Sequence, residues 1–306
     1  MVQLEKESGL DGKDNLLQEV LNSVGIGIIS LDSNQSIKIV NMETLKIFGY
    51  KQKEIENNNI KLLFHSTEHE KLKTYLSAAS NRKNNISEPR VELTGIHKDK
   101  STFPVELTIS NNTHNKNCIN TLILKDITKS KHVEQELKYQ AYFDQLTEIP
   151  NRTLFIDRAE TALNQAKRAN EGLGIIFIDL DEFKEINDSL GHDGGDIMLK
   201  IISQRLINSA RKSDTVSRRG GDEFTILMPR LNHVEDAAKL AERVLESNKE
   251  PIKIKEELVY PKTSIGISVF PKDGDSIDIL IQNADQAMYQ AKGSGKNQYA
   301  IFQSKN

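Results

Sequence analysis

The sequence Ile178-Asp179-Leu180-Asp181-Glu182-Phe183-Lys184 decides how the second half of the chain folds. It completes an apolar run over residues 173–180, which predicts a strand buried within a sheet. Carboxylates at the C-terminal end of such a strand are well placed for a metal, because open sheets bind ligands at that end. Mg²⁺ takes carboxylate oxygens and completes its shell with phosphates and water. A second interpretation is equally open for this segment alone: the acids begin a helix, with Asp181 as its N-cap.

Helices and strands alternate on both sides of this strand. The predicted helices cover residues 151–169, 182–188, 193–210, 234–246 and 277–291, and the predicted strands cover residues 173–180, 215–219, 223–228, 259–270 and 298–302. We therefore expect a palm-like α/β domain, in which helices flank a central sheet that contains antiparallel strands. The strand order does not follow from the sequence.

A second acidic motif is Arg218-Arg219-Gly220-Gly221-Asp222-Glu223-Phe224. Gly-Gly between two strand-like runs predicts a hairpin turn, whose N–H groups can meet phosphate oxygens. Strand alternation places Asp222 and Glu223 on opposite faces, so we expect only one of them to point at a metal shared with Asp179. The simpler interpretation is an ordinary hairpin with solvated acids.

Other polar residues are candidates for nucleotide contacts. A carboxylate such as Asp196 can accept hydrogen bonds from the N1–H and N2–H₂ edge of guanine, and Asn187 adds a donor and an acceptor. Lys184, Lys292 and Lys296 are candidates for triphosphate contacts, the last two from a glycine-rich run. The simpler interpretation is a helix-end Asn and a glycine C-cap with solvated lysines.

These motifs occur together in one order. The opening motif is Phe143-Asp144-Gln145-Leu146-Thr147-Glu148-Ile149-Pro150-Asn151-Arg152, and the closing motif is Lys292-Gly293-Ser294-Gly295-Lys296-Asn297. Between them lie the predicted strand 173–180 with its acidic end, Asn187-Asp188, Gly191-His192-Asp193 with Gly195-Asp196, and the Gly-Gly hairpin. In this order they resemble the GGDEF family, the diguanylate cyclases, over residues 143–304. The chain has Glu148-Ile149 where that family usually has Gly-Leu.

The resemblance implies that two GTP molecules condense to cyclic di-GMP with release of two pyrophosphates. Mg²⁺ would be held by Asp179, the Leu180 carbonyl and Asp222, with Glu223 beside them as a further ligand and catalytic carboxylate. Asp222 would also be the general base, and Lys184 would neutralise charge on the phosphates. Because each domain holds one GTP, a homodimer is implied. The implied GTP-binding residues are Phe183, Asn187, Asp196, Gly220, Gly221, Lys292 and Lys296.

A further motif, Arg211-Lys212-Ser213-Asp214, matches the inhibitory product site of the family. The resemblance implies that Arg211 and Asp214 bind cyclic di-GMP, with Arg243 as a second arginine. The simpler interpretation is an i,i+3 ion pair at the end of a helix.

The first half of the chain predicts strands around short helices, followed by three longer strands. Gly25–Asp32, Asn41, Phe48-Gly49-Tyr50, the run from Lys98 to Leu107 and Asp126-Ile127-Thr128 resemble a PAS sensor domain over residues 12–128. This implies a small α+β domain, an antiparallel sheet with short helices, and does not identify a ligand. We expect His65 and His69 to be helix-start residues rather than haem ligands, and Cys118 to lack a flavin-adduct role.

Residues 129–142 predict a polar linker helix. Val133, Leu137 and Ala141 recur every four residues and give a narrow apolar stripe. The stripe fits either a solvated linker helix or a short parallel coiled coil that pairs two chains.

Composition limits the function classes. The chain has 306 residues, 41 Lys+Arg, 44 Asp+Glu and one cysteine. A net charge of −3 supplies no basic footprint for nucleic acid, and the apolar runs are too short to cross a bilayer. We expect a cytoplasmic protein of two domains that acts as a cyclase. The alternative is a non-catalytic receptor for GTP or cyclic di-GMP; an intact acidic motif favours the enzyme.

Overall fold

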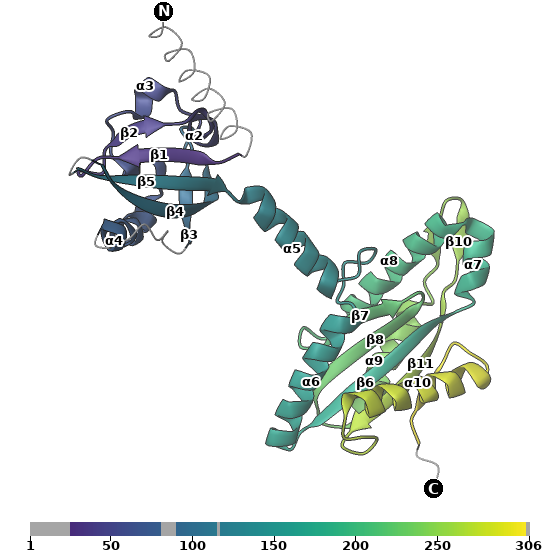
Figure 1. The fold of residues 1–306 in the computed structure, drawn as a ribbon. Coiled ribbons are helices and arrows are strands. Elements are labelled where there is room, and N and C mark those ends of the chain that lie inside the picture. The colour runs from purple at the N-terminus through teal and green to yellow at the C-terminus, as the bar shows by residue number, and fades with distance from the viewer. Residues whose placement is uncertain (1–24, 81–89, 115–116, 304–306) are drawn as a thin grey trace, which may run out of the picture. The chain divides into compact units, whose positions relative to one another are not determined.

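The computed structural model describes residues 25–80, 90–114 and 117–303, with side chains omitted at 79–80 and 111–119. The chain divides into two compact units, Met1–Gln135 and Glu136–Asn306, which are described separately. Figure 1 shows a sheet in each unit and the helix α5 (Thr128–Tyr142), within which the division falls. Residues 12–24 of the predicted first domain lie outside the described residues.

The first unit is built on a five-stranded antiparallel sheet with strand order β2-β1-β5-β4-β3. Its strands are β1 (Gly27–Leu31), β2 (Ile37–Val40), β3 (Val91–Ile96), β4 (Thr102–His114) and β5 (Asn117–Asp126). Its helices are α2 (Met42–Phe48), α3 (Gln52–Ile55) and α4 (His69–Ser80), with 3₁₀ turns at Ile60–Leu63 and Ser66–Glu68. The predicted antiparallel sheet with short helices is confirmed.

Asn41 explains how the first two strands join α2. Its Oδ1 atom accepts hydrogen bonds from the N–H groups of Thr44 (3.0 Å) and Ile28 (2.8 Å), and its Nδ2 donates to the Ile26 carbonyl (2.8 Å). One side chain therefore caps the helix and holds the strand beside it. Gly49 ends the helix with φ 74°, a conformation that glycine adopts without strain.

The second unit has a five-stranded sheet with order β12-β11-β6-β8-β7, in which only the β11–β12 pair is parallel. Its strands are β6 (Gly172–Asp181), β7 (Thr215–Gly220), β8 (Glu223–Leu231), β11 (Lys262–Phe270) and β12 (Tyr299–Ile301), and a separate hairpin pairs β9 (Ile252–Ile254) with β10 (Glu257–Val259). Its helices are α6 (Arg152–Ala169), α7 (Phe183–Leu190), α8 (His192–Ser209), α9 (Val234–Ser247) and α10 (Ile277–Gly293). The predicted palm-like α/β architecture is confirmed.

Helices cover both faces of this sheet, as Figure 1 shows, and β6 lies at its centre. Leu173, Ile175 and Phe177 pack in the core cluster of α6 and α10. Ile176 and Ile178 pack on the other face, in the core cluster of α8 and α9. This period of two carries Asp179 toward the α6–α10 face, where the apolar run of β6 ends.

Two local predictions differ from the structure. The predicted strand at 259–270 begins too early, because Val259 ends β10 and β11 begins at Lys262. Pro261 lies between them and has no N–H to donate to a sheet. The N-cap position of α7 is Glu182, with φ 62°, so the interpretation of Asp181 as an N-cap is wrong.

Candidate active site

Asp179 is a buried carboxylate at the end of β6. Its Oδ1 atom lies 2.6 Å from the Nζ atom of Lys292, which α10 supplies from its last turn. Burial raises the pKa of Asp179, the Lys292 hydrogen bond opposes that change, and the charges of Asp222 and Asp181 raise the pKa further. Three segments far apart in the sequence thus bring one cation and an excess of carboxylates together.

Asp181 has a structural part in the same region. Its Oδ1 accepts the Ser264 hydroxyl (2.8 Å) and its Oδ2 accepts the Asn297 N–H (3.0 Å). It therefore ties the end of β6 to β11 and to the loop after α10. The same loop carries Lys296, whose Nζ lies 2.9 Å from Glu182.

The Gly-Gly turn joins β7 to β8, as predicted. Gly220 and Gly221 have φ values of 147° and 53°, which strongly favour glycine. Glu223 is the register partner of Asp179, so it lies on the same face of the sheet. Asp222 lies in the turn, where strand alternation does not apply, and its charge also acts on Asp179. The expectation of one hairpin acid near Asp179 therefore rested on a rule that fails at the turn.

Arg218 braces the hairpin, a role that sequence reasoning missed. Its Nη1 lies 2.9 Å and 3.1 Å from the two carboxylate oxygens of Asp144, and its Nε and Nη2 donate to the Gly221 carbonyl. Burial alone would raise the pKa of Asp144, but hydrogen bonds from Thr147 and Arg218 outweigh it and lower that pKa. No short-range signal links Asp144 to Arg218, because 74 residues separate them.

The carboxylates fit a hard divalent cation. Asp179 is 7% exposed, and the nearby charges of Asp222 and Asp181 disfavour its ionised form. Carboxylate oxygens are the ligands that Mg²⁺ prefers, and it commonly uses only one or two of them. In the described part of the chain, no three His, Cys, Asp or Glu side chains converge as a complete metal site. The protein therefore offers a partial ligand set that phosphates and water would complete.

The candidate guanine residues lie where α7 meets α8. An added Cβ at Gly195 would collide with the side-chain oxygen of Asn187 and come within 3.1 Å of the Phe183 ring. Glycine at this position therefore lets Asn187 and Phe183 approach the first turn of α8. Asp196 follows in that turn and is exposed, as is Lys184 on α7.

Arg211 and Asp214 line a cavity of about 350 Å³. Asp214 Oδ2 accepts a hydrogen bond from the main-chain N–H of Arg211 (2.9 Å). The simpler interpretation from the sequence was an ion pair between the two side chains; the structure instead pairs this carboxylate with the main chain. Arg158 also lines the cavity, and sequence reasoning missed it. Arg243 donates instead to the Ser209 carbonyl (3.2 and 3.0 Å) and does not line the cavity.

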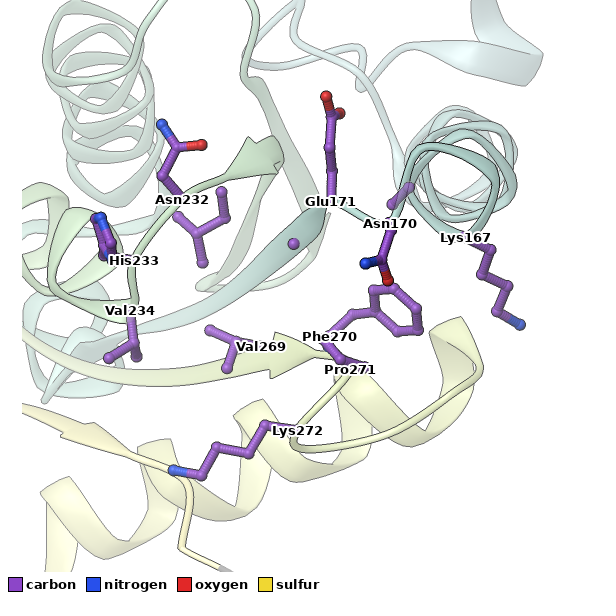
Figure 2. A pocket seen from close by; sticks show the side chains of 13 residues that line it. Lys167, Asn170, Glu171, Asn232, His233, Val234, Val269, Phe270, Pro271 and Lys272 are labelled. Carbon is purple, nitrogen blue, oxygen red and sulfur yellow. The ribbon is translucent and has the colours of Figure 1, made fainter.

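Figure 2 shows another cavity, of about 390 Å³, around the start of β6 and the end of β11. Phe270 and Val269 contribute apolar surface to it, and His233 lies at its edge. None of the predicted site residues lines it. It lies at the opposite end of β6 from Asp179.

Two histidines of the first unit, His65 and His69, lie at the start of α4. The Nε2 atom of His69 lies 3.0 Å and 3.2 Å from the carbonyl oxygens of Phe64 and Lys61. His65 Nδ1 lies 2.8 Å from the Thr67 hydroxyl and accepts the Thr67 N–H. These contacts agree with the predicted helix-start role. Cys118 lies in β5, and its side chain is outside the described residues.

None of the helices in the described ranges combines the length and apolar character needed to span a bilayer.

Comparisons with known proteins agree with this architecture. The family described as "Diguanylate cyclase, GGDEF domain" matches residues 141–298, and the PAS domain family matches residues 23–129. Diguanylate cyclase TpbB of Pseudomonas aeruginosa is 42% identical over 157 residues, covering 51% of this chain and 36% of its own. The cyclic di-GMP phosphodiesterase NbdA of the same organism is 39% identical over 171 residues, covering 56% of this chain and 22% of its own.

Solved structures give the same result for the second unit. The crystal structure of the GGDEF domain of TpbB is 38% identical with a TM-score of 0.51, covering 52% of this chain and 99% of that one. The coiled coil and GGDEF domain of DgcB from Caulobacter crescentus, in complex with c-di-GMP, is 26% identical with a TM-score of 0.51, covering 56% and 91%. The chain spans about a fifth to a third of the length of these curated relatives. Because the family match covers just over half of its length, the chain belongs to the GGDEF family and carries a PAS domain before its GGDEF domain.

Proposed function

We propose that this protein is a diguanylate cyclase, which condenses two GTP molecules into cyclic di-GMP and two pyrophosphates. The observation that carries the proposal is the buried Asp179 carboxylate, which lies beside the Lys292 ammonium and within the field of Asp222. A carboxylate excess at a strand end adds little to folding, but it suits a metal-bound triphosphate. The relatives include cyclases and phosphodiesterases, and the intact acids favour the cyclase.

In the proposed reaction, the 3′-hydroxyl of one GTP attacks the α-phosphorus of the other. The new O–P bond forms as the bond to pyrophosphate breaks, and Asp222 accepts the hydroxyl proton. The reciprocal attack, by the 3′-hydroxyl of the second nucleotide on the α-phosphorus of the first, closes the ring and releases the second pyrophosphate. Bound Mg²⁺ would neutralise the triphosphate and stabilise charge on the attacking and leaving oxygens. Asp179, the Leu180 carbonyl, Asp222 and Glu223 are the proposed metal-binding groups.

The remaining residues of the site would bind and orient the nucleotide. Asn187 and Asp196 would read the guanine edge, with Phe183 beside them. The N–H groups of Gly220 and Gly221 would meet phosphate oxygens, because neither residue has a Cβ to block the approach. Lys184, Lys292 and Lys296 would contact phosphates; Lys292 already lies at the acidic cluster.

We test this function with pure protein, GTP and Mg²⁺, separating the nucleotides by chromatography. The wild type is expected to form cyclic di-GMP, and Asp222→Asn is expected to lose that activity while its melting temperature stays unchanged. Asp157→Asn, which removes an exposed carboxylate on α6, is the matched control and keeps full activity. Binding of GTP without any turnover by the wild type would support the receptor alternative.

Two GTP sites must face each other, so we propose a homodimer whose pairing involves α5 under control of the PAS domain. Val133 and Leu137 are 45% and 60% exposed on α5, and no described residue of that helix is buried. Specific activity is expected to fall on dilution, because the dimer dissociates. Leu137→Glu is expected to move this fall to higher protein concentration, whereas Glu136→Lys on the same helix has a smaller effect. Equal dilution curves for all three proteins would exclude pairing through α5.

We further propose that cyclic di-GMP binds the cavity of Arg211 and Asp214 and inhibits the enzyme, with Arg243 as a second arginine outside the cavity lining. Guanidinium groups bind phosphates in a planar fork, and a carboxylate accepts from the guanine edge. A protein that uses GTP in this way is expected in the cytoplasm.

A further inference from the structure

The β9–β10 hairpin has a lysine where its turn favours another residue. Ile254 pairs with Glu257, so Lys255 and Glu256 form the turn, and Lys255 has φ 56°. Two-residue hairpin turns need positive φ values and therefore favour glycine, asparagine and aspartate. A Cβ makes this left-handed conformation unfavourable, and such an outlier is a reason to look for a role of the side chain.

The side chain of Lys255 reaches the end of helix α7. Its Nζ atom donates to the carbonyl oxygen of Leu190 at 3.1 Å, across 65 residues of sequence. Leu190 is the last residue of α7, so its carbonyl has no partner within the helix, and a cation is favoured at this negative end of the helix dipole. Figure 1 shows the hairpin beside the corner between α7 and α8.

A second residue of the hairpin packs on the same corner. Ile254 precedes Lys255 and is fully buried. A Cβ added to Gly194, in the first turn of α8, would lie 3.5 Å from the Cγ2 atom of Ile254 and 2.6 Å from the Cβ atom of Leu190. Adjacent hairpin residues therefore make one apolar and one polar contact with the corner.

The corner joins the two candidate guanine residues. Gly191 lies between the helices with φ 80°. Its N–H donates to the Asn187 carbonyl at 2.9 Å, and its own carbonyl accepts from the N–H groups of Gly194 (3.0 Å) and Gly195 (3.2 Å). Asn187 lies one turn before this corner and Asp196 shortly after it. The geometry of the corner therefore sets the spacing between the two side chains.

We propose that Lys255 is a positioning residue for the guanine site, which it supports through the Leu190 carbonyl. Two polar groups that read one base edge have to keep their spacing to within about 0.5 Å. The ammonium of Lys255 fixes the corner and with it the spacing of Asn187 and Asp196. The inference rests on the proposed guanine site and not on turnover. Adenine lacks the N1–H and N2–H₂ donors of guanine, so binding of ATP does not depend on this spacing.

Calorimetry of the full-length chain tests the inference without turnover, with Mg²⁺ and the α,β-methylene analogues of GTP and ATP as probes. Lys255→Met removes the ammonium and keeps the apolar part of the side chain. Affinity for the GTP analogue is expected to fall about threefold to tenfold, as for the loss of one hydrogen bond, while affinity for the ATP analogue stays unchanged.

Lys255→Gly separates this role from stability. It is expected to lose the same affinity for the GTP analogue, while its melting temperature stays unchanged or rises, because glycine adopts φ 56° without strain. This variant also keeps the test decisive if Lys255→Met does not fold. Lys255→Arg keeps a cationic donor and is expected to restore the wild-type ratio of the two affinities.

The matched control is Lys253→Met, which removes a positive charge from the same hairpin, where Glu256 is the ion-pair partner at 3.7 Å. It is expected to keep the wild-type ratio. With GTP, Lys255→Met is expected to raise KM at unchanged kcat, because Lys255 has no part in the proposed reaction.

Three results would overturn the proposal: unchanged affinities in Lys255→Met, equal losses for both analogues, or the same loss in Lys253→Met. A wild type that binds both analogues equally has no guanine site and would overturn it as well. A wild type that prefers the GTP analogue but forms no cyclic di-GMP would refute the cyclase alone, and the ratio of the two affinities would still decide the role of Lys255.

Discussion

The PAS unit and the GGDEF unit both bury apolar cores, but they differ in the polar groups that they bury. Among the described residues, the buried polar side chains of the PAS unit are Thr44 and Asn120, which carry no charge. The GGDEF unit buries three carboxylates, those of Asp179, Asp181 and Asp273. A buried carboxylate is costly unless it is paired, so each of the three needs a reason.

Two of these carboxylates lie at opposite ends of the sheet and have different reasons. Burial raises the pKa of both Asp179 and Asp273. Asp273 Oδ2 accepts the N–H of Val269 at 2.8 Å, so a neutral main-chain donor satisfies it and closes the turn after β11. Asp179 relies on the Lys292 ammonium and is opposed by the charges of Asp222 and Asp181. The identity of the partner, more than burial, separates a structural carboxylate from a functional one.

The largest expected effect comes from removing the charge of the Asp179 carboxylate. Asp179→Asn is expected to lower cyclic di-GMP synthesis by about 100- to 1,000-fold, because the preorganised charge at the triphosphate is lost. Lys292 is partly exposed and can be hydrated, so the free energy of unfolding is expected to change by less than about 1 kcal/mol.

Asp273→Ala is the counterpart of that substitution. It is expected to lose about 1–3 kcal/mol of unfolding free energy, because the buried Val269 N–H loses its acceptor. Turnover of the folded fraction stays unchanged. Activity assays and urea unfolding measure both quantities, and the comparison fails if Asp273→Ala abolishes turnover or Asp179→Asn mainly destabilises the fold.

Sequence reasoning located Asp179 and, through the resemblance, placed Asp222 beside it, but it missed the direct contact between Asp179 and Lys292. The apolar run of β6 and its period of two are local features, so the strand, its buried faces and its acidic end could be predicted. The order of the strands depends on pairing between distant segments, which a single sequence does not encode in its local pattern. The Arg218–Asp144 brace and the place of Arg158 in the cavity of Arg211 and Asp214 are long-range in the same way. The face of Asp222 was uncertain because turn residues leave the strand alternation.

A carboxylate that is hydrogen-bonded to the main chain can also bind a ligand if it lines a cavity. Asp214 is a test case for this. Its Oδ2 accepts the Arg211 N–H, as Asp273 accepts that of Val269. Arg211→Ala is expected to weaken cyclic di-GMP binding by about ten- to a hundredfold without lowering the initial rate, because a bidentate charged contact is lost. Calorimetry with a non-hydrolysable GTP analogue in the active site measures the binding. Arg243→Ala, outside the cavity lining, is expected to have a smaller effect, and full inhibition of Arg211→Ala would leave the motif as a surface feature.

Asp196 extends the comparison to exposed carboxylates, because it is proposed to bind substrate although it is not buried. Asp196→Ala is expected to weaken GTP binding by about tenfold and to reduce the preference for guanine over adenine, because the acceptor for N1–H and N2–H₂ is removed. Competition between GTP and ATP measures the preference. Asp188→Ala on α7, also exposed, is the control. Unchanged affinity and base choice would place the guanine site elsewhere.

The smallest expected effect concerns Asp144, whose carboxylate is structural although it braces the Gly-Gly hairpin. Its pKa is lowered in the folded state because hydrogen bonds from Thr147 and Arg218 outweigh burial. A carboxylate whose folded pKa is depressed contributes stability above its unfolded pKa of about 3.9, and that stability is lost as the pH falls through the folded pKa. Asp144→Asn is therefore expected to cost about 1 kcal/mol near neutral pH, since the pair is partly exposed.

The pH dependence separates this ionic contribution from simple loss of packing. The difference in unfolding free energy between wild type and Asp144→Asn is expected to stay constant from about pH 7 to pH 5. It is expected to shrink below about pH 4, where Asp144 of the unfolded wild type takes up a proton before the folded carboxylate does. Urea unfolding at each pH measures it, with Asp157→Asn as the exposed control. A difference that persists undiminished at low pH would mean that packing, and not charge, holds Arg218 to Asp144. The hairpin would then be braced as Asp273 braces its own turn, by a contact that needs no ionised partner.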